Sequence, residues 1–318
     1  MKKISLVVAL VLALSVSPVH AAGTFLYIAT GGTGGTYYPL GGAIADIISK
    51  NVSDLQVTSE TGNASSANIK LISAGQVDMA LAQNDVAYWA WKGMAPFTER
   101  HENIRVVASL YPEHVHCIYM KDAEISDVED LRGKRVSVGA PDSGVLGDVS
   151  AILKVAGMHM GDLSADFLDF NSTTQNFKDG HLDAGFVVAG YPTSSITDLA
   201  ATRDISLLSF SDDFLASLQE EFPFFVKDTI PAGTYRGVDH DVATPAVLAM
   251  LVCDAALSDE VVYSFTKAFW ENVSDLRKAH PQADYIKMEK ALDGASIPVH
   301  PGAAKFYREK DMTIPETD

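Results

Sequence analysis

Apolar residues recur along the chain in two alternating periods. The apolar run 25–29 predicts a short strand, and the apolar positions of 40–48 then follow the i, i+4, i+7, i+8 spacing of one helix face. In the second half, 135–138 predicts another strand and 145–156 another amphipathic helix. A glycine-containing loop separates strand from helix each time. Strand, loop and helix in this order predict an α/β fold with largely parallel sheets.

The two halves of the chain repeat one plan. The tetrapeptide 75–78, Gly-Gln-Val-Asp, leads into the apolar run 79–82. In the second half the tetrapeptide 180–183, Gly-His-Leu-Asp, leads into the apolar run 184–188. The repeat predicts two α/β lobes built alike.

Two long segments, 106–119 and 244–253, are predicted to be extended and to cross between these lobes. We therefore expect a first lobe at 24–114 plus 248–318 and a second lobe at 115–247.

The N-terminus has the three parts of a secretory signal peptide. Lys2 and Lys3 precede an apolar run at 4–16, and small residues then favour cleavage after Ala21. No later segment offers the roughly 20 consecutive apolar residues of a membrane span. We expect residues 1–21 to be removed and the mature protein to be periplasmic.

Charge narrows the classes of partner. Lys and Arg number 24 against 41 Asp and Glu, which gives a formal net charge of −17. Nucleic acid is not an expected partner, because proteins bind it mainly through cations on its phosphates. Only two cysteines are present, Cys117 and Cys253. They exclude a disulfide scaffold, and the sequence leaves open whether they pair or remain buried thiols.

The first glycine-rich loop fits neither nucleotide-binding motif. Walker A requires a lysine after its last glycine, whereas Gly35 is followed by Thr36 and Tyr37. The dinucleotide fingerprint requires a third glycine where Tyr37 stands. We therefore expect no nucleotide cofactor, and no other cofactor or metal in the site.

Two further chemistries are weaker alternatives. A hydrolase could use Ser143 as nucleophile, but the flanking glycines of a nucleophile elbow are missing, and a base would have to come from His181 or His300. A metal carrier could use His114 and His116, which strand alternation places on one face, together with Glu113. The simpler interpretation of these three residues is a polar strand face near a hinge, and we expect no enzyme.

The two strand-to-helix loops, 31–37 and 139–145, predict a binding site. Glycine lets the backbone approach a ligand, and the free N–H groups of a helix N-terminus bind anions. If the two lobes face each other, both N-termini point into one cleft. A small carboxylate fits there without a lysine or arginine, and Tyr37 or Tyr38 can cover its aliphatic part.

Several stretches, spread in order over nearly the whole mature chain, resemble the TAXI family, the extracytoplasmic solute-binding receptors of TRAP transporters. They are 30–42, 62–68, 75–85, 130–139, 183–192, 230–235 and 299–303. The resemblance implies a type II periplasmic-binding-protein fold, with two lobes that close on a ligand. It also implies TRAP membrane permease subunits as partner, driven by an ion gradient, and a small organic anion as ligand, such as a glutamate-like amino acid or a dicarboxylate.

The resemblance also implies a set of ligand-binding residues in both lobes. They are Thr33, Gly35, Thr36, Tyr37, Asn68 and Gln83 in the first lobe, and Ser143, Gly144, Ala189 and Gly190 in the second. The same fold serves receptors of ATP-driven importers and sensor kinases, which are the alternatives among binding proteins.

The second loop departs from the family pattern, which has glycine at Asp142 and threonine at Val145. An acid beside an anion site suggests that Asp142 receives a ligand ammonium, which would favour an amino acid over a dicarboxylate. Alternatively, Asp142 caps the following helix and never meets the ligand.

Overall fold

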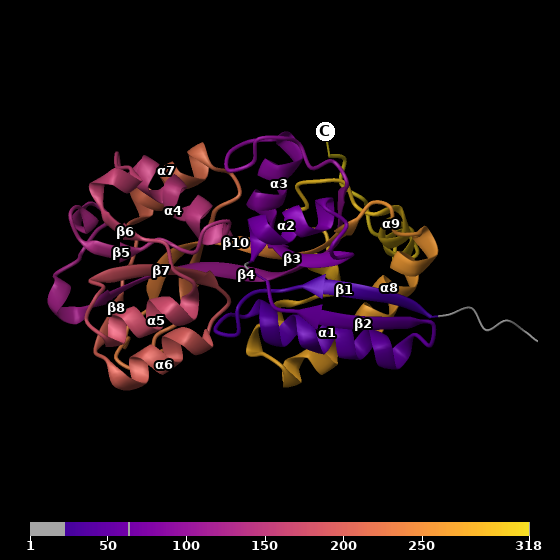
Figure 1. Cartoon of the computed structure of the whole chain (residues 1–318), viewed down its shortest axis with the longest axis horizontal. Helices are drawn as coiled ribbons and strands as arrows, with labels where there is room; N and C mark the ends of the chain where they lie inside the picture. Colours follow the sequence, from indigo (N-terminus) through magenta and orange to yellow (C-terminus); the bar gives the residue numbers. More distant parts are fainter. Residues whose placement is uncertain (1–22, 63, 318) are drawn as a thin grey trace, which may run out of the picture.

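The computed structural model describes residues 23–62 and 64–317. Within them one mixed sheet runs through the molecule in the order β2-β1-β3-β10-β4-β7-β5-β6, with β8 on β4 and β9 on β10. Figure 1 shows two lobes side by side along it. The predicted signal peptide, 1–21, lies outside the described residues, and among those residues no helix is long and apolar enough to cross a membrane.

Both lobes contain the same β-α-β-α-β unit with parallel pairing, and this shared unit underlies the two similar α/β lobes that the sequence repeat predicted. In the first lobe its elements are β1 (Thr24–Ala29), α1 (Tyr37–Asn51), β2 (Leu55–Glu60), α2 (Ser65–Ser73) and β3 (Met79–Gln83). In the second lobe they are β5 (Arg135–Ser137), α4 (Gly144–Val155), β6 (Ser164–Asp166), α5 (Phe170–Lys178) and β7 (Ala184–Ala189).

The repeated tetrapeptides have the same role in the two units. Asp78 accepts a hydrogen bond from the backbone N–H of Tyr27 on β1 at 2.8 Å. Asp183 accepts one from the backbone N–H of Arg135 on β5 at 2.9 Å. Each aspartate therefore ties the turn before the third strand of its unit to the first strand.

The remaining elements complete the lobes and join them. α3 (Asn84–Lys92), α8 (Asp259–Glu271) and α9 (Pro301–Arg308) belong to the first lobe, and α6 (Ser194–Thr202), β8 (Ile205–Leu207), α7 (Asp212–Glu221) and β9 (Val226–Ile230) to the second. The long antiparallel strands β4 (Ile104–Met120) and β10 (Val242–Asp254) pass through both. The predicted lobe boundaries, 114/115 and 247/248, fall inside these two strands and stay a prediction.

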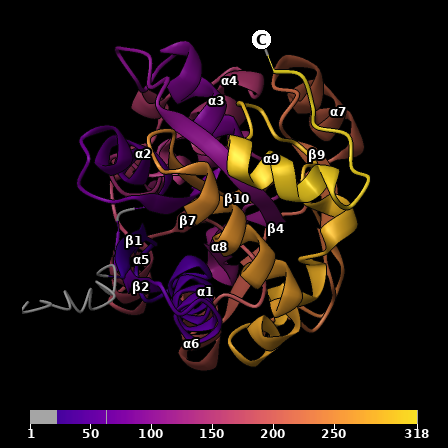
Figure 2. The ribbon, with the colours of Figure 1, turned by 90° about the vertical axis from the view of Figure 1, so that its right-hand side faces the viewer.

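Helices cover both faces of the sheet, which explains why its strands are apolar on both sides. In the first lobe, Met79 and Leu81 pack with α1 and α8 in one core cluster, whereas Ala80 and Ala82 pack with α2 and α3 in another. Figure 2 shows these two helix pairs on opposite sides of the strands. The cores contain Cys117 and Cys253 as separate buried thiols, which settles the open question in favour of free cysteines.

Candidate ligand-binding site

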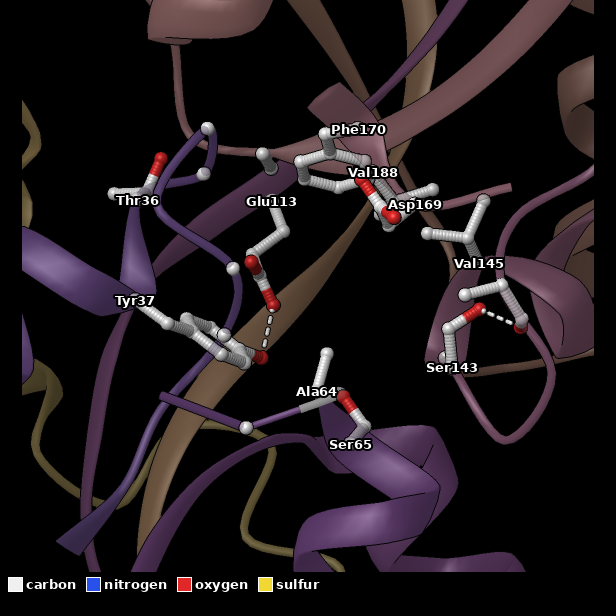
Figure 3. Close-up of a pocket in the computed structure, with 18 of the residues that line it drawn as sticks. Thr36, Tyr37, Ala64, Ser65, Glu113, Ser143, Val145, Asp169, Phe170 and Val188 are labelled. Atoms are coloured by element: carbon white, nitrogen blue, oxygen red, sulfur yellow. Dashed lines mark hydrogen bonds between the residues drawn. The ribbon is translucent and has the colours of Figure 1, made fainter. Parts of the chain in front are cut away.

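A cavity of about 350 Å³ lies between the two lobes (Figure 3). It is lined by the first residues of four helices, α1 and α2 from the first lobe and α4 and α5 from the second. In each unit the loops after the first two strands lead into these helices. These loops lie at the carboxyl ends of the parallel strands, which is where α/β folds bind their ligands. The volume is at the lower end of the usual range for small-molecule sites, about 300–1,000 Å³.

The helix N-termini are built in different ways. Ser143 caps α4 and accepts a hydrogen bond from the N–H of Leu146 at 3.3 Å, and Asp169 caps α5 in the same manner through Ser172. Thr36 precedes α1 without a side-chain cap, and its hydroxyl instead donates to the Gly190 carbonyl across the lobes at 3.1 Å. Apart from the N–H groups of Leu146 and Ser172, which these caps occupy, and that of Ala67, which donates to the Asp142 carbonyl, first-turn N–H groups have no acceptors within their own helices and can bind an anion.

Glycines let the lobes approach each other around the cavity. A Cβ on Gly144 would overlap the side-chain oxygen of Gln83, and a Cβ on Gly34 would overlap that of Asn171. A Cβ on Gly35 would lie 3.1 Å from the Phe170 ring, closer than most real contacts. Side chains at these positions would therefore hold the lobes apart.

Hydrogen bonds between the lobes surround the cavity, so the structure is a closed form. The Asn171 amide donates to the Thr33 hydroxyl at 3.0 Å. On the opposite rim, the N–H of Ala67 donates to the Asp142 carbonyl at 2.9 Å, and Lys70 pairs with the Asp142 carboxylate at 2.7 Å.

Glu113 reaches into the cavity from β4 (Figure 3). Its side chain is 2% exposed, and the Tyr37 hydroxyl donates to its Oε2 at 2.6 Å. Burial raises the pKa of Glu113 to about 8; the Tyr37 hydrogen bond lowers this pKa, and the charge of Asp85 raises it. The site thus holds a buried carboxyl group that lacks an opposite charge.

Two more buried acids meet between the lobes beside the cavity. Asp85 at the start of α3 and Asp148 on α4 are close enough to interact electrostatically, and the Gln83 amide donates to Asp148 at 2.6 Å. Within the described chain, each of the two carboxyl groups has one buried oxygen without a hydrogen-bond partner. Burial raises the pKa of both carboxyl groups, and the charge of Asp85 raises that of Asp148 further. Both carboxyl groups therefore hold a proton more readily than exposed aspartates do.

The structure brings most of the predicted binding residues together. The cavity lining includes Thr33, Gly35, Thr36, Tyr37, Gln83, Ser143, Gly144 and Ala189. Three predicted residues lie outside the lining. Asn68 is buried and donates to the carbonyls of Thr30 and Leu81, both at 2.8 Å. Gly190 offers its carbonyl to Thr36, and Asp142 pairs with Lys70 at the surface.

The alternative role for Asp142 as helix cap is wrong, because Ser143 caps α4.

The Ser143 hydroxyl, the proposed hydrolase nucleophile, is occupied by this capping hydrogen bond and also donates to the Ala140 carbonyl at 2.7 Å. No histidine is among the described residues that line the cavity. His181 is exposed, and His300 is buried in contact with the Leu257 carbonyl. The geometry of a serine hydrolase is therefore not found in the described residues.

His114 and His116 lie on the same face of β4, as strand alternation predicted. Each ring contacts a side chain from another part of the fold. His114 contacts Asp228 at 3.0 Å, and His116 contacts the Tyr235 hydroxyl at 2.9 Å. Burial lowers the pKa of His116 to about 3, so its ring is neutral. Over residues 23–62 and 64–317, no group of three metal-ligating side chains forms a site.

Sequence reasoning assigned Glu113 to a possible metal site and missed its place in the cavity. It also did not single out Ser65, Asp169 or Phe170, which line the cavity at the starts of α2 and α5. For α5 a signal was available, because Asp169 before Ser172 is a typical N-cap pattern. For α2 the helix start has no capping signal, because Ala64 precedes it without a side-chain cap, and only the family-like stretch 62–68 pointed to this segment.

Residues 28–310 match the family model described as the NMT1-like family. The binding-protein component of an ABC phosphonate transporter from Pseudomonas aeruginosa is similar over 91% of this chain and 95% of that chain, with 11% identity and a TM-score of 0.52. A protein from Bordetella bronchiseptica RB50 is similar over 92% and 91%, with 16% identity and a TM-score of 0.54. The alkanesulfonate-binding protein SsuA from Xanthomonas axonopodis pv. citri aligns over 91% and 85%, with 14% identity and a TM-score of 0.49. At these identities the similarity concerns the fold, which is that of periplasmic binding proteins.

Proposed function

Because the chain belongs to the NMT1-like family and has a closed cavity between two lobes, we propose that it is a periplasmic receptor that captures a small carboxylate or amino acid and delivers it to a membrane transporter. The protein binds its ligand and does not transform it. The residues proposed to contact the ligand are those of the sequence prediction that line the cavity, together with Ser65, Glu113 and Phe170.

The convergence of four helix N-termini on one cavity is the observation that carries this proposal. Oriented N–H groups and the positive ends of the helix dipoles stabilise a ligand carboxylate without a cationic side chain. Two of the helices come from each lobe, so one ligand contacts both lobes only in the closed form. A ligand that binds the closed form better shifts the protein toward it, which is how binding is coupled to closure.

The resemblance to TAXI receptors supports a TRAP permease, driven by an ion gradient, as the membrane partner. An ATP-driven importer is the second candidate, favoured by the shared fold of the phosphonate-transporter component. A neighbouring gene for a polytopic permease without an ATPase subunit supports the first candidate, and one with an ATPase subunit supports the second.

A thermal-shift screen of residues 22–318 against amino acids, mono- and dicarboxylates, sugars and divalent metals tests the proposal. A ligand at about 100 times its Kd stabilises the folded protein by about 2.7 kcal/mol, which raises the melting temperature by several degrees. We expect such a rise with at least one amino acid or carboxylate. Stabilisation by zinc alone, or by sugars alone, would contradict the proposal.

A further inference from the structure

The charges around the cavity are unusual for an anion receptor. The ionisable side chains of its described lining are Tyr37, Glu113 and Asp169, and none of the lining residues is lysine, arginine or histidine. Asp85 and Asp148 place two more buried carboxyl groups beside the cavity. The side chains therefore favour a positive group, while the helix N-termini favour a negative one.

Of the two lining carboxylates, Glu113 is the one available to a ligand. Asp169 is exposed, and both its oxygens accept hydrogen bonds from Ser172, at 3.0 Å from the backbone N–H and 2.9 Å from the hydroxyl. Glu113 is buried, and within the described chain its carboxyl group has a single hydrogen bond, from Tyr37 to Oε2. Figure 3 shows this carboxyl group at the centre of the site, between the Tyr37 and Phe170 rings.

A buried carboxyl group with no opposite charge is unfavourable, and it stays protonated unless a cation is supplied. None of the described residues that line the cavity supplies one. The His116 ring on the other face of the strand is neutral, and Lys70 pairs with Asp142 at the rim. A cation on the ligand would provide the missing charge and let Glu113 ionise, in a position where water is excluded.

We propose that Glu113 binds the ammonium group of the ligand, and that the receptor therefore selects amino acids over the corresponding plain carboxylic acids. This inference rests on the proposed receptor function and assigns its ligand class. The ligand carboxylate contacts the helix N-termini, and the ammonium group contacts Oε1 of Glu113 from the cavity side. Tyr37 is a positioning residue, because its hydroxyl fixes the orientation of the Glu113 carboxylate.

Calorimetric titration of residues 22–318 at pH 7 tests this assignment with matched pairs of compounds. The pairs are L-glutamate and glutarate, L-aspartate and succinate, and L-leucine and 4-methylpentanoate. A hydrogen bond to a charged group contributes about 1.5–3 kcal/mol, so we expect the amino member of the best pair to bind about ten- to a hundredfold more tightly.

Three variants isolate the role of Glu113. In Glu113→Gln we expect the amino member to lose at least about tenfold in affinity while its deaminated partner changes by less than about threefold. Glu113→Asp keeps the charge, so it keeps the preference for the amino member at lower affinity. Asp142→Gly is expected to keep the preference, because Asp142 lies outside the cavity lining. Melting temperatures without ligand show that each variant is folded.

Several results would overturn the assignment. They are equal losses for both members of a pair in Glu113→Gln, tighter binding of the deaminated acid by the natural protein, or loss of the preference in Asp142→Gly instead. These outcomes leave the receptor function standing. If no member of any pair binds, the proposed carboxylate receptor fails, and the Glu113 assignment fails with it.

Discussion

Glu113, Asp85 and Asp148 are acidic residues from three separate elements, and folding buries all three near one cavity. In the sequence each looks like an ordinary charged position, because burial depends on partners that are distant along the chain. Glu113 stood out only as a neighbour of two histidines, which suggested a metal. In the structure His114 contacts Asp228, His116 contacts the Tyr235 hydroxyl, and no group of three metal-ligating side chains forms among the described residues, which fits the simpler interpretation of a polar strand face.

The Asp85–Asp148 pair predicts that ligand affinity depends on pH. In the closed form both side chains are fully buried, which raises the pKa of both, whereas in an open form both would meet water at their usual pKa. The facing groups are Gln83, which donates to Asp148, and Glu113, whose charge raises the pKa of Asp148. Closure therefore favours proton binding by the pair.

Because the closed form binds more protons, affinity falls as pH rises above the ordinary aspartate pKa, by at most about tenfold per pH unit for one proton. In Asp148→Asn the amide keeps the size of the side chain and can still accept the Gln83 hydrogen bond, but it does not titrate, so the slope is expected to flatten. Dissociation constants of both proteins measured from pH 6 to pH 9 check this. Parallel slopes in the two proteins would show that the pair does not couple closure to pH.

At the scale of elements, the glycine loops before α1 and α4 were predicted correctly, because each follows a clear strand and precedes a clear amphipathic helix. Asn68 in the first turn of α2 was among the predicted binding residues, but Ser65 at the start of α2 and the start of α5 were not recognised as parts of the site. Their positions in the cavity follow from the parallel packing of each unit, which local periodicity does not show.

Gly144 at the start of α4 provides a test of lobe contact. Its backbone does not require glycine, but a Cβ there would overlap Gln83 of the other lobe. We expect Gly144→Ala to fold with nearly unchanged stability and to lose about tenfold or more in ligand affinity, because the closed form is strained. The matched control is Gly42→Ala on α1, where an added Cβ meets only Ser59 at 3.7 Å.

Calorimetry and thermal unfolding of both variants separate the two effects. Equal affinity in Gly144→Ala and Gly42→Ala would mean that close approach of α4 to Gln83 is not needed for binding. A large loss of stability in Gly144→Ala alone would mean that the contact also supports the fold.

At the scale of the whole molecule, two lobes of one design could be predicted because a strand, a glycine loop, an amphipathic helix and a glycine-to-aspartate tetrapeptide before an apolar run occur twice in the sequence. The single continuous sheet could not be predicted from the sequence. It depends on antiparallel pairing between β4 and β10, which are far apart in sequence and have register shifts within the ladder. The pairing carries the chain between lobes in two long strands, and bending of these strands is the expected route to opening.

The central claim is that one small amino acid is held between the two lobes. A crystal structure of residues 22–318 with the compound that stabilises it most tests this claim most directly. The account predicts a closed molecule with the ligand in the interlobe cavity, its carboxylate at the helix N-termini and its ammonium within hydrogen-bond distance of Glu113. A ligand bound outside that cavity, or in contact with only one lobe, would contradict it.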